Sequence, residues 1–318
     1  MKIASTCLCR VASFLAFLVL IPASANAQSS AADRARLLQA QQNVPATVPG
    51  TAPGQVEGGY AAASPNDQDL GEQAILKRVE QYEPFTLETG TPIYYTSNVA
   101  LVDHGAMSDV IIAPFVGLTY APRLTKTLYS EFTVRQQFFY YQDFTGFNFA
   151  SFDAIAGVAY SAPQLHNLSL RANLDYNRLT PTDSFDDFFS NVALNLSAEL
   201  PIPIGRAQQI SLGASASVSL YAQPEPPQRN DFGVYLGYSV AVTRNLFLSA
   251  SGQIVVRPYD SNGRTDVSEI LSGSANYRVR DWLTVSAITS FVANQSNQSV
   301  FDYQVFNIGG GITVSFKF

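Results

Sequence analysis

Three features of the sequence predict an all-β fold: an antiparallel up-and-down β-barrel that crosses a membrane with about twelve strands. Charged residues make up only 14% of the 318 residues, against about 25% in soluble proteins. Hydrophobic residues reach 47% and aromatic residues 12%, which excludes a chain that is disordered throughout. Apolar and polar residues alternate at every second position over most of the chain, as in a strand with one apolar face. Only the N-terminus has a long apolar run, so a bundle of membrane-spanning helices is also excluded.

The first 27 residues are typical of a signal peptide. Lys2 and Arg10 precede an apolar stretch over residues 11–21, and Ala25 and Ala27 provide the small residues that signal peptidase accepts. The apolar stretch is too short to span a bilayer. We therefore expect export and cleavage, with a mature chain that begins near Gln28.

Cleavage would remove Cys7 and Cys9, the two cysteines of the sequence. We therefore expect no disulfide, no metal site and no cofactor in the mature chain. Removing Lys2 and Arg10 from the 19 basic residues leaves 17 against 25 acidic residues, a net charge of −8. This acidic balance argues against nucleic acid as a partner.

Two segments separate the signal peptide from the predicted barrel. Residues 28–66 are rich in Ala, Gln, Pro, Gly and Ser, and we expect a flexible linker. Residues 67–84 begin with the capping residues Asp67 and Asp69, show helical spacing and end at Pro84, which predicts a short periplasmic helix. A linker that is only transiently helical is the alternative, because short helices are marginal on their own.

Residues 91–318 form the predicted outer-membrane barrel. The final segment is the clearest, because Ile312, Val314, Phe316 and Phe318 alternate with polar residues and the chain ends on an aromatic side chain. This ending is similar to the C-terminal signal by which the barrel-assembly machinery binds outer-membrane barrels. Eleven similar segments precede it, so the predicted strands are 91–102, 109–120, 128–141, 149–160, 168–179, 188–200, 210–222, 232–242, 246–257, 269–279, 283–293 and 304–318.

The second predicted strand departs from the pattern. Its alternation turns Ile111, Ala113 and Phe115 toward the lumen, and Pro114 interrupts the ladder of hydrogen bonds. We expect this strand to be bulged or its apolar residues to be shielded.

An even number of strands places both ends of the barrel on one side, the periplasm. The connections between the predicted strands form two groups: short basic turns, which we expect in the periplasm, and longer acidic loops, which we expect outside the cell. Aromatic residues fall into two girdles near the strand ends, as is usual at membrane interfaces. One girdle comprises Tyr120, Tyr160, Tyr277, Trp282 and Phe318, and the other Phe138, Tyr140, Phe149, Phe152, Tyr176, Phe188, Phe232, Phe291 and Phe306.

The same alternation predicts which charged residues face the lumen. If neighbouring strands pair symmetrically about the predicted turns, Arg135 lies opposite Asp153, and Asp153 lies opposite Asp175. It also places Gly157 between Glu131 and Arg171, which could reach each other across the missing side chain. The candidate lumen or constriction residues are Glu131, Arg135, Asp153, Arg171, Asp175, Glu199, Arg257 and Arg278.

These charges support two interpretations. They could form the constriction of a narrow porin-like channel for small polar solutes or ions, or they could pair and fill the lumen of a non-conducting structural or adhesive protein. An autotransporter-type translocator is a further alternative, with residues 28–84 threading the lumen as a helix. An outer-membrane phospholipase-like enzyme would need a catalytic set around His104 and Ser108; the required His-x-Ser spacing is absent, so we expect no enzyme activity.

Residues 71–78 (GEQAILKR), 94–101 (YYTSNVAL) and 297–303 (NQSVFDY) resemble a group of uncharacterised, porin-like outer-membrane β-barrel proteins of Gram-negative bacteria. The resemblance covers about residues 67–318. It implies a barrel in the cell outer membrane, with the lipid bilayer and lipopolysaccharide as its surroundings. That group brings no activity and no functional residue with it.

Overall fold

The computed structural model describes residues 31–40, 83–205, 207–261 and 263–318. Residues 31–40 form a helix, and the rest of the described chain forms a β-barrel with short connections. The strands are β1 (Phe85–Thr96), β2 (Asp109–Ile112), β3 (Phe115–Tyr120), β4 (Leu128–Tyr141), β5 (Phe149–Ala162), β6 (Leu168–Pro181), β7 (Phe189–Pro203), β8 (Gln208–Gln223), β9 (Asp231–Ala241), β10 (Leu246–Pro258), β11 (Thr265–Arg280), β12 (Leu283–Ser296) and β13 (Tyr303–Lys317).

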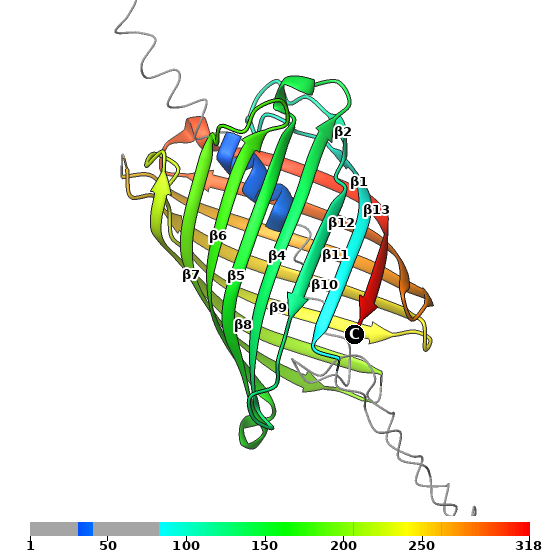
Figure 1. The fold of residues 1–318 in the computed structure, drawn as a ribbon. Helices are drawn as coiled ribbons and strands as arrows, with labels where there is room; N and C mark the ends of the chain where they lie inside the picture. Colours follow the sequence, from blue (N-terminus) through cyan, green and yellow to red (C-terminus); the bar gives the residue numbers. More distant parts are fainter. Residues whose placement is uncertain (1–30, 41–82, 206, 262) are drawn as a thin grey trace, which may run out of the picture.

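The barrel is closed. Each strand pairs antiparallel with its neighbours in the chain, and β13 pairs with β1 from Thr86 opposite Lys317 to Thr96 opposite Asn307. β2 and β3 share one position in the wall, because both pair with β1 on one side and β4 on the other. The thirteen segments therefore make twelve strand positions, and the predicted fold class is confirmed (Figure 1).

The first strand lies earlier in the chain than predicted. The sequence favoured residues 91–102, whereas β1 covers Phe85–Thr96 and residues 97–102 belong to the following loop. The apolar residues of that loop suggested a continuation, but the loop turns away after Ser97, whose backbone N–H still donates to the Phe306 carbonyl at 2.9 Å. The other predicted strands overlap observed ones.

Alternation separates an apolar outer face from a polar inner face. In β8, Leu212 is 45% exposed on the outside, whereas Ser211 is buried on the inside. A bulge interrupts the pattern at Leu220, because Val192 pairs with Tyr221 while Ala193 pairs with Ser219. Leu220 and Tyr221 are consequently both exposed on the outer face, and Ala222 is buried.

The predicted irregularity of residues 109–120 is confirmed. The strand breaks between Ile112 and Phe115, and the Pro114 carbonyl accepts a hydrogen bond from the Phe138 N–H at 3.0 Å. Ile111 and Ala113 are 1% and 0% exposed, so these inward apolar side chains are shielded.

The two barrel ends carry different connections. Phe85 and Phe318 exchange backbone hydrogen bonds of 3.0 Å, so both lie at one end of the barrel together with the shorter turns. Loops that are longer on average, such as residues 97–108 and 182–188, join the strands at the opposite end. Most predicted girdle residues are exposed on the outer face: Tyr120, Tyr160, Tyr277, Trp282, Phe318, Phe138, Tyr140, Tyr176, Phe232, Phe291 and Phe306.

Phe149 and Phe188 are exceptions to the predicted girdle. Phe149 is only 4% exposed and Phe188 packs against it inside the barrel, where their ring centroids are 6.4 Å apart. The alternation of β5 turns Phe149 inward, and an apolar cluster in the lumen covers both rings. The aromatic composition alone did not distinguish the two faces.

Glycines 309–311 allow β13 to lie close to β1. A Cβ atom at Gly311 would come 2.7 Å from the Cα atom of Pro92, and one at Gly309 would overlap the carbonyl oxygen of Ile93; on the other side, one at Gly310 would come 2.6 Å from the carbonyl oxygen of Ser286 in β12. The three glycines therefore permit tight closure of the wall rather than leaving space in the lumen. Among the described residues no helix is long and apolar enough to cross a bilayer.

Candidate functional site in the lumen

The helix of residues 31–40, here called the lumen helix, lies inside the barrel in the half that is farther from Phe318 (Figure 1). It falls within the segment predicted as a flexible linker (28–66), so that prediction is wrong at these ten residues. The periplasmic helix predicted over 67–84 falls largely on residues outside the described part of the chain, and Phe85 already begins β1. The lumen helix forms because Ala and Leu favour helices and because the barrel buries them.

Two sides of the lumen helix contact apolar parts of the wall. Ala32, Ala35 and Leu38 join a buried cluster, and Leu37 joins a second one with Val292 and Val305. The wall residues of the first cluster come from both sides of the barrel: Tyr94, Val99, Ile111, Ala113, Phe139, Tyr141, Phe149, Leu179, Phe189 and Ala222. The helix is therefore what shields the apolar inner face of β2 and its neighbours.

The polar residues of the lumen helix bind the wall at several points. Arg36 donates to the Pro227 carbonyl at 2.9 Å, and its guanidinium lies 4.3 Å from the ring centroid of Phe189. Gln39 donates through its amide to the hydroxyl of Ser151. The contacts of Arg36 at a loop and of Gln39 inside β5 orient the helix, so that its first residues lie at the level of the longer loops.

Asp33 has the densest set of contacts. Its Oδ1 atom accepts hydrogen bonds from Arg229 Nη1 at 2.5 Å and from the Tyr259 hydroxyl at 3.0 Å. Its Oδ2 atom accepts from Arg264 Nη1 at 3.3 Å. The two arginine side chains are 9% and 6% exposed, and the Asp33 side chain is 11% exposed. Arg229, Tyr259 and Arg264, here called the carboxylate clamp, thus surround one carboxylate in a nearly dry environment.

The wall itself holds the carboxylate clamp. Arg229 Nε donates to Asp231 at 3.0 Å, and Arg264 Nε donates to Asp266 at 2.9 Å. The Arg264 guanidinium lies between two rings, 4.0 Å from the centroid of Tyr259 and 3.6 Å from that of Phe301. These interactions do not involve the lumen helix.

Charge neighbours shift the pKa values of the buried arginines. Burial would lower the pKa of Arg229, but Asp231, Tyr259 and Asp33 together raise it well above its usual value. Burial likewise opposes the charge of Arg264, yet its pKa is raised by the hydrogen bond to Asp266 and by Tyr259 and Asp33. Arg36 has the opposite balance: burial, followed by repulsion from Arg229, lowers its pKa to about 10. All three side chains keep a positive charge at neutral pH.

The predicted charged residues are distributed along the wall of the lumen. Arg135 pairs with Asp153 across β4 and β5, as predicted. The Arg135 guanidinium lies 4.1 Å from the ring centroid of Phe115. The Asp153 carboxylate accepts hydrogen bonds from Ser151 at 3.0 Å and from Asn177 at 2.6 Å.

The predicted neighbours Asp153 and Asp175 are not opposite each other. Asp153 pairs with Asn177 and Asp175 pairs with Ile155, so the register of the two strands differs from the predicted one by two residues. The turn is centred on residue 165 rather than on residue 164, because Ala162 pairs with Leu168 across a turn in which His166 and Asn167 adopt left-handed backbone angles (φ of 56° and 60°). Because of this shift, the residue opposite Asp153 is Asn177, whose amide donates a hydrogen bond to the Asp153 carboxylate, and not a second carboxylate.

The same shift corrects the prediction for Glu131 and Arg171. Gly157 pairs with Glu131 on one side, as predicted, but with Asn173 on the other. Arg171 lies opposite Ala159 and is exposed. Gly157 therefore does not lie between the two charged residues.

Glu199 takes part in a contact across three strands. It pairs with Gly213 of β8, and Gly213 pairs with Tyr235 of β9. The Tyr235 hydroxyl forms a hydrogen bond with the Glu199 carboxylate, and the charge of Arg171 also acts on Tyr235.

Arg257 and Arg278, the last two predicted lumen residues, lie far apart along the wall. Arg257 is 7% exposed, donates to Ser268 and lies 3.6 Å from Asp231. It thus belongs to the surroundings of the carboxylate clamp. Arg278 lies near the other end, 5.6 Å from the ring centroid of Phe247.

Sequence reasoning missed Asp33, Arg229 and Arg264. Asp33 lies in a stretch (AADRARLLQA) whose helical composition was hidden by Pro- and Gly-rich flanks. Asp231 and Asp266, which hold the two arginines, lie where the sequence indicates only longer acidic loops. The available signal was a recurring spacing, Arg-x-Asp at 229–231 and at 264–266.

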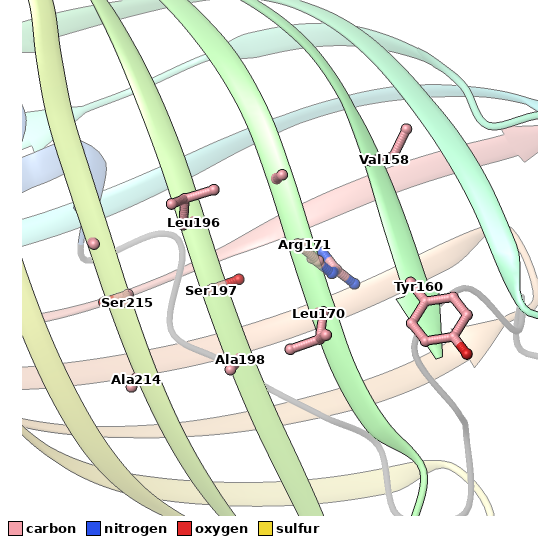
Figure 2. A pocket seen from close by; sticks show the side chains of 11 residues that line it. Val158, Tyr160, Leu170, Arg171, Leu196, Ser197, Ala198, Ala214 and Ser215 are labelled. Atoms are coloured by element: carbon pink, nitrogen blue, oxygen red, sulfur yellow. The ribbon is translucent and has the colours of Figure 1, made fainter. Parts of the chain in front are cut away.

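Figure 2 shows a separate hollow on the outer surface of β5–β8. Its apolar lining consists of outward-facing residues, with Ala198 and Ala214 between the larger Leu196, Leu170 and Tyr160. This hollow faces away from the lumen. Within the described ranges, no cluster of three or more His, Cys, Asp or Glu residues could hold a metal ion, and His104 pairs only with the adjacent Asp103 at 2.7 Å.

No protein-family model matches the chain, and no curated protein matches its sequence. Solved structures with similar folds include an outer-membrane channel from Pseudomonas putida F1 (14% identity, 74% of this chain and 98% of that chain, TM-score 0.49). They also include the NanC porin (8% identity, 71% and 98%, TM-score 0.43). The translocator domain of the autotransporter NalP from Neisseria meningitidis is a third (10% identity, 75% and 90%, TM-score 0.42).

Proposed function

We propose that this protein is a narrow channel of the Gram-negative outer membrane for small polar solutes or ions, and that the lumen helix closes its outer end. The outer face supports a membrane location, since its exposed residues are apolar along every strand and aromatic near both ends. A soluble protein rarely exposes so much continuous apolar surface. The bilayer and lipopolysaccharide would cover this face, with the shorter turns in the periplasm.

The observation that carries the channel proposal is the contrast between the two halves of the lumen. Around the lumen helix, inward residues such as Phe139, Phe189 and Val292 are 0% exposed. Nearer the other end, inward residues are small or polar and partly exposed, for example Ser197, Ser215, Ser249 and Ser272. Among the described residues, the ten-residue lumen helix accounts for the filling of the outer half, and its displacement would connect the polar inner half with the outside.

We also propose that the C-terminal strand carries the signal for assembly. Ile312, Phe316 and Phe318 are 55%, 50% and 58% exposed on the outer face, and Val314 shares that face. This arrangement would present an apolar edge to the barrel-assembly machinery before the wall closes.

Single-channel recording in planar bilayers tests the channel proposal. Gln39→Cys together with Ser151→Cys would be joined by a short reducible bis-methanethiosulfonate reagent, because these two side chains are in contact. We expect the joined protein to stay closed and the reduced protein to show larger openings. The Gln39→Cys single variant, treated in the same way, is the control. If neither the reduced protein nor the wild type conducts above background, the channel proposal is wrong.

A translocator of the autotransporter type is the second candidate, and the orientation of the lumen helix favours it. The helix begins at the level of the longer loops and runs toward the inside, as the last part of an exported passenger would. Protease added to intact cells distinguishes the two functions. Degradation of a reporter domain fused before residue 31 supports a translocator, because the reporter has then crossed the membrane, and an intact reporter supports the channel.

A further inference from the structure

The carboxylate clamp has the properties of a ligand site. Three donors from separate parts of the wall converge on one carboxylate, which is the usual way in which proteins bind this group. Arg229 precedes β9, Tyr259 follows β10 and Arg264 precedes β11. In this structure the carboxylate comes from the chain itself, through Asp33.

The clamp is preorganised without its occupant. Asp231 and Asp266 orient the two arginines, and the rings of Tyr259 and Phe301 enclose Arg264. Tyr259 also accepts a hydrogen bond from Arg229 Nη1 at 3.0 Å. Loss of Asp33 would therefore leave the donors in place rather than let them collapse.

The charge balance also favours an anion. The wall contributes Arg229, Arg257 and Arg264 against Asp231 and Asp266, which leaves one positive charge in excess when Asp33 is absent. A buried, uncompensated arginine is costly, so a carboxylate from solution would be stabilised in this place.

We propose that Arg229, Tyr259 and Arg264 form a binding site for small carboxylate-bearing solutes at the outer end of the lumen, and that Asp33 is its tethered occupant. A solute with a carboxylate competes with Asp33 and favours release of the lumen helix. The proposal rests on the channel function in one respect, because it names the class of solute that such a channel would admit. Binding itself requires no current.

Saturation-transfer NMR with acetate as the probe tests the site, using the full chain in detergent micelles. We expect a clear acetate signal from Asp33→Ala and a signal about tenfold weaker from the wild type, because a tethered group competes at an effective concentration in the millimolar range. Asp33→Ala combined with Arg229→Gln and Arg264→Gln should lose the signal. Asp183→Ala, in an exposed outer loop, is the charge-matched control and should behave as the wild type. Acetamide, the neutral analogue, should not bind to any variant.

A second measurement covers the case in which Asp33→Ala does not fold. In otherwise wild-type protein with a spin label on Ala40→Cys, an exposed position, sodium acetate should raise the mobility of the label more than sodium chloride of equal ionic strength. Equal acetate binding by wild type and Asp33→Ala, or no binding together with no effect on the label, overturns the proposed site. A protein that binds acetate without conducting would refute the channel and leave the site intact.

Discussion

The ring of Tyr235 lies across the backbone of Gly213, so that a Cβ atom at residue 213 would overlap the ring. The two residues are paired across β8 and β9, and this position lets the Tyr235 hydroxyl reach Glu199 on the strand beyond. Because Gly213 of β8 has no side chain, Tyr235 of β9 can reach across it and form a hydrogen bond with Glu199 of β7.

Gly213→Ala should displace the Tyr235 ring and break its hydrogen bond with Glu199. We expect the free energy of unfolding to fall by about 1–3 kcal/mol, the usual cost of overpacking. Urea-dependent unfolding in lipid vesicles measures it. Gly237→Ala is the control, since a Cβ atom there would meet its nearest neighbour at 3.7 Å. Equal losses in both variants would contradict the role of Tyr235.

Arg264→Lys should weaken docking of the lumen helix nearly as much as Arg264→Gln. A lysine keeps the charge but cannot bind Asp266 and Asp33 at once while lying flat between Tyr259 and Phe301. We expect a loss of about 1.5–3 kcal/mol, as for other charged hydrogen bonds, read from the mobility of the label on Ala40→Cys.

Arg178→Gln serves as the comparison for Arg264. Its ion pair with Asp187 is 3.7 Å long and more than a third exposed, so screening by water should leave little effect. A label that responds equally to Arg178→Gln and Arg264→Gln would mean that net charge, not the clamp, holds the helix.

Ionisation of Tyr259 should weaken docking of the lumen helix as the pH rises above 10. Burial, the largest cause, and the carboxylates of Asp33 and Asp266 raise the pKa of Tyr259, against the opposing effect of Arg229 and Arg264. A hydroxyl whose pKa is raised in the docked state stabilises docking fully below its ordinary value of 10. That contribution is lost progressively at higher pH, when the undocked state ionises first.

Tyr259→Phe isolates this effect. The variant lacks the hydroxyl, so its docking should be weaker at pH 8 but change less between pH 8 and 11. Arg36, whose lowered pKa acts in the opposite direction, is present in both proteins and cancels in the comparison. Identical pH profiles of the label on Ala40→Cys would exclude Tyr259 as the titrating group.

Arg171→Glu should shift ion selectivity toward cations. Arg171 faces the lumen and is exposed there, so reversing its charge changes the field in the path without removing a buried partner. The reversal potential in a salt gradient measures the change. Lys126→Glu makes the same charge change in an exposed turn, and a selectivity that follows Lys126 instead of Arg171 would place the path elsewhere.

The alternation of side chains was enough to predict the barrel and most of its inner and outer residues. Ile312, Phe316 and Phe318 are outside, and Arg135 lies beside Asp153, because both results depend only on the period of a strand. The position of Asp153 relative to Asp175 depended on which residue lies at the centre of the turn. Left-handed angles at His166 and Asn167, neither of them glycine, give no strong signal in a single sequence.

The lumen helix and the carboxylate clamp were beyond sequence reasoning for a different reason. Asp33 is 196 residues from Arg229 in the chain. Phe149 and Phe188 are aromatic residues like those of a girdle, so their residue type did not indicate that they face the lumen. Only the closed wall brings these parts together. Besides the repeated Arg-x-Asp spacing, a second sign was the apolar inner face of residues 111–115, which an empty polar lumen would not explain.

The seam between β1 and β13 has a consequence for the timing of biogenesis. The lumen helix precedes β1 in the chain, whereas the wall that encloses it is completed by residues 303–317, the last strand to be synthesised. A seam between residues more than 200 positions apart also forms slowly, because its contacts are the least local in the molecule. During that interval the helix can enter sideways through the open wall, and after closure it can leave only along the barrel axis.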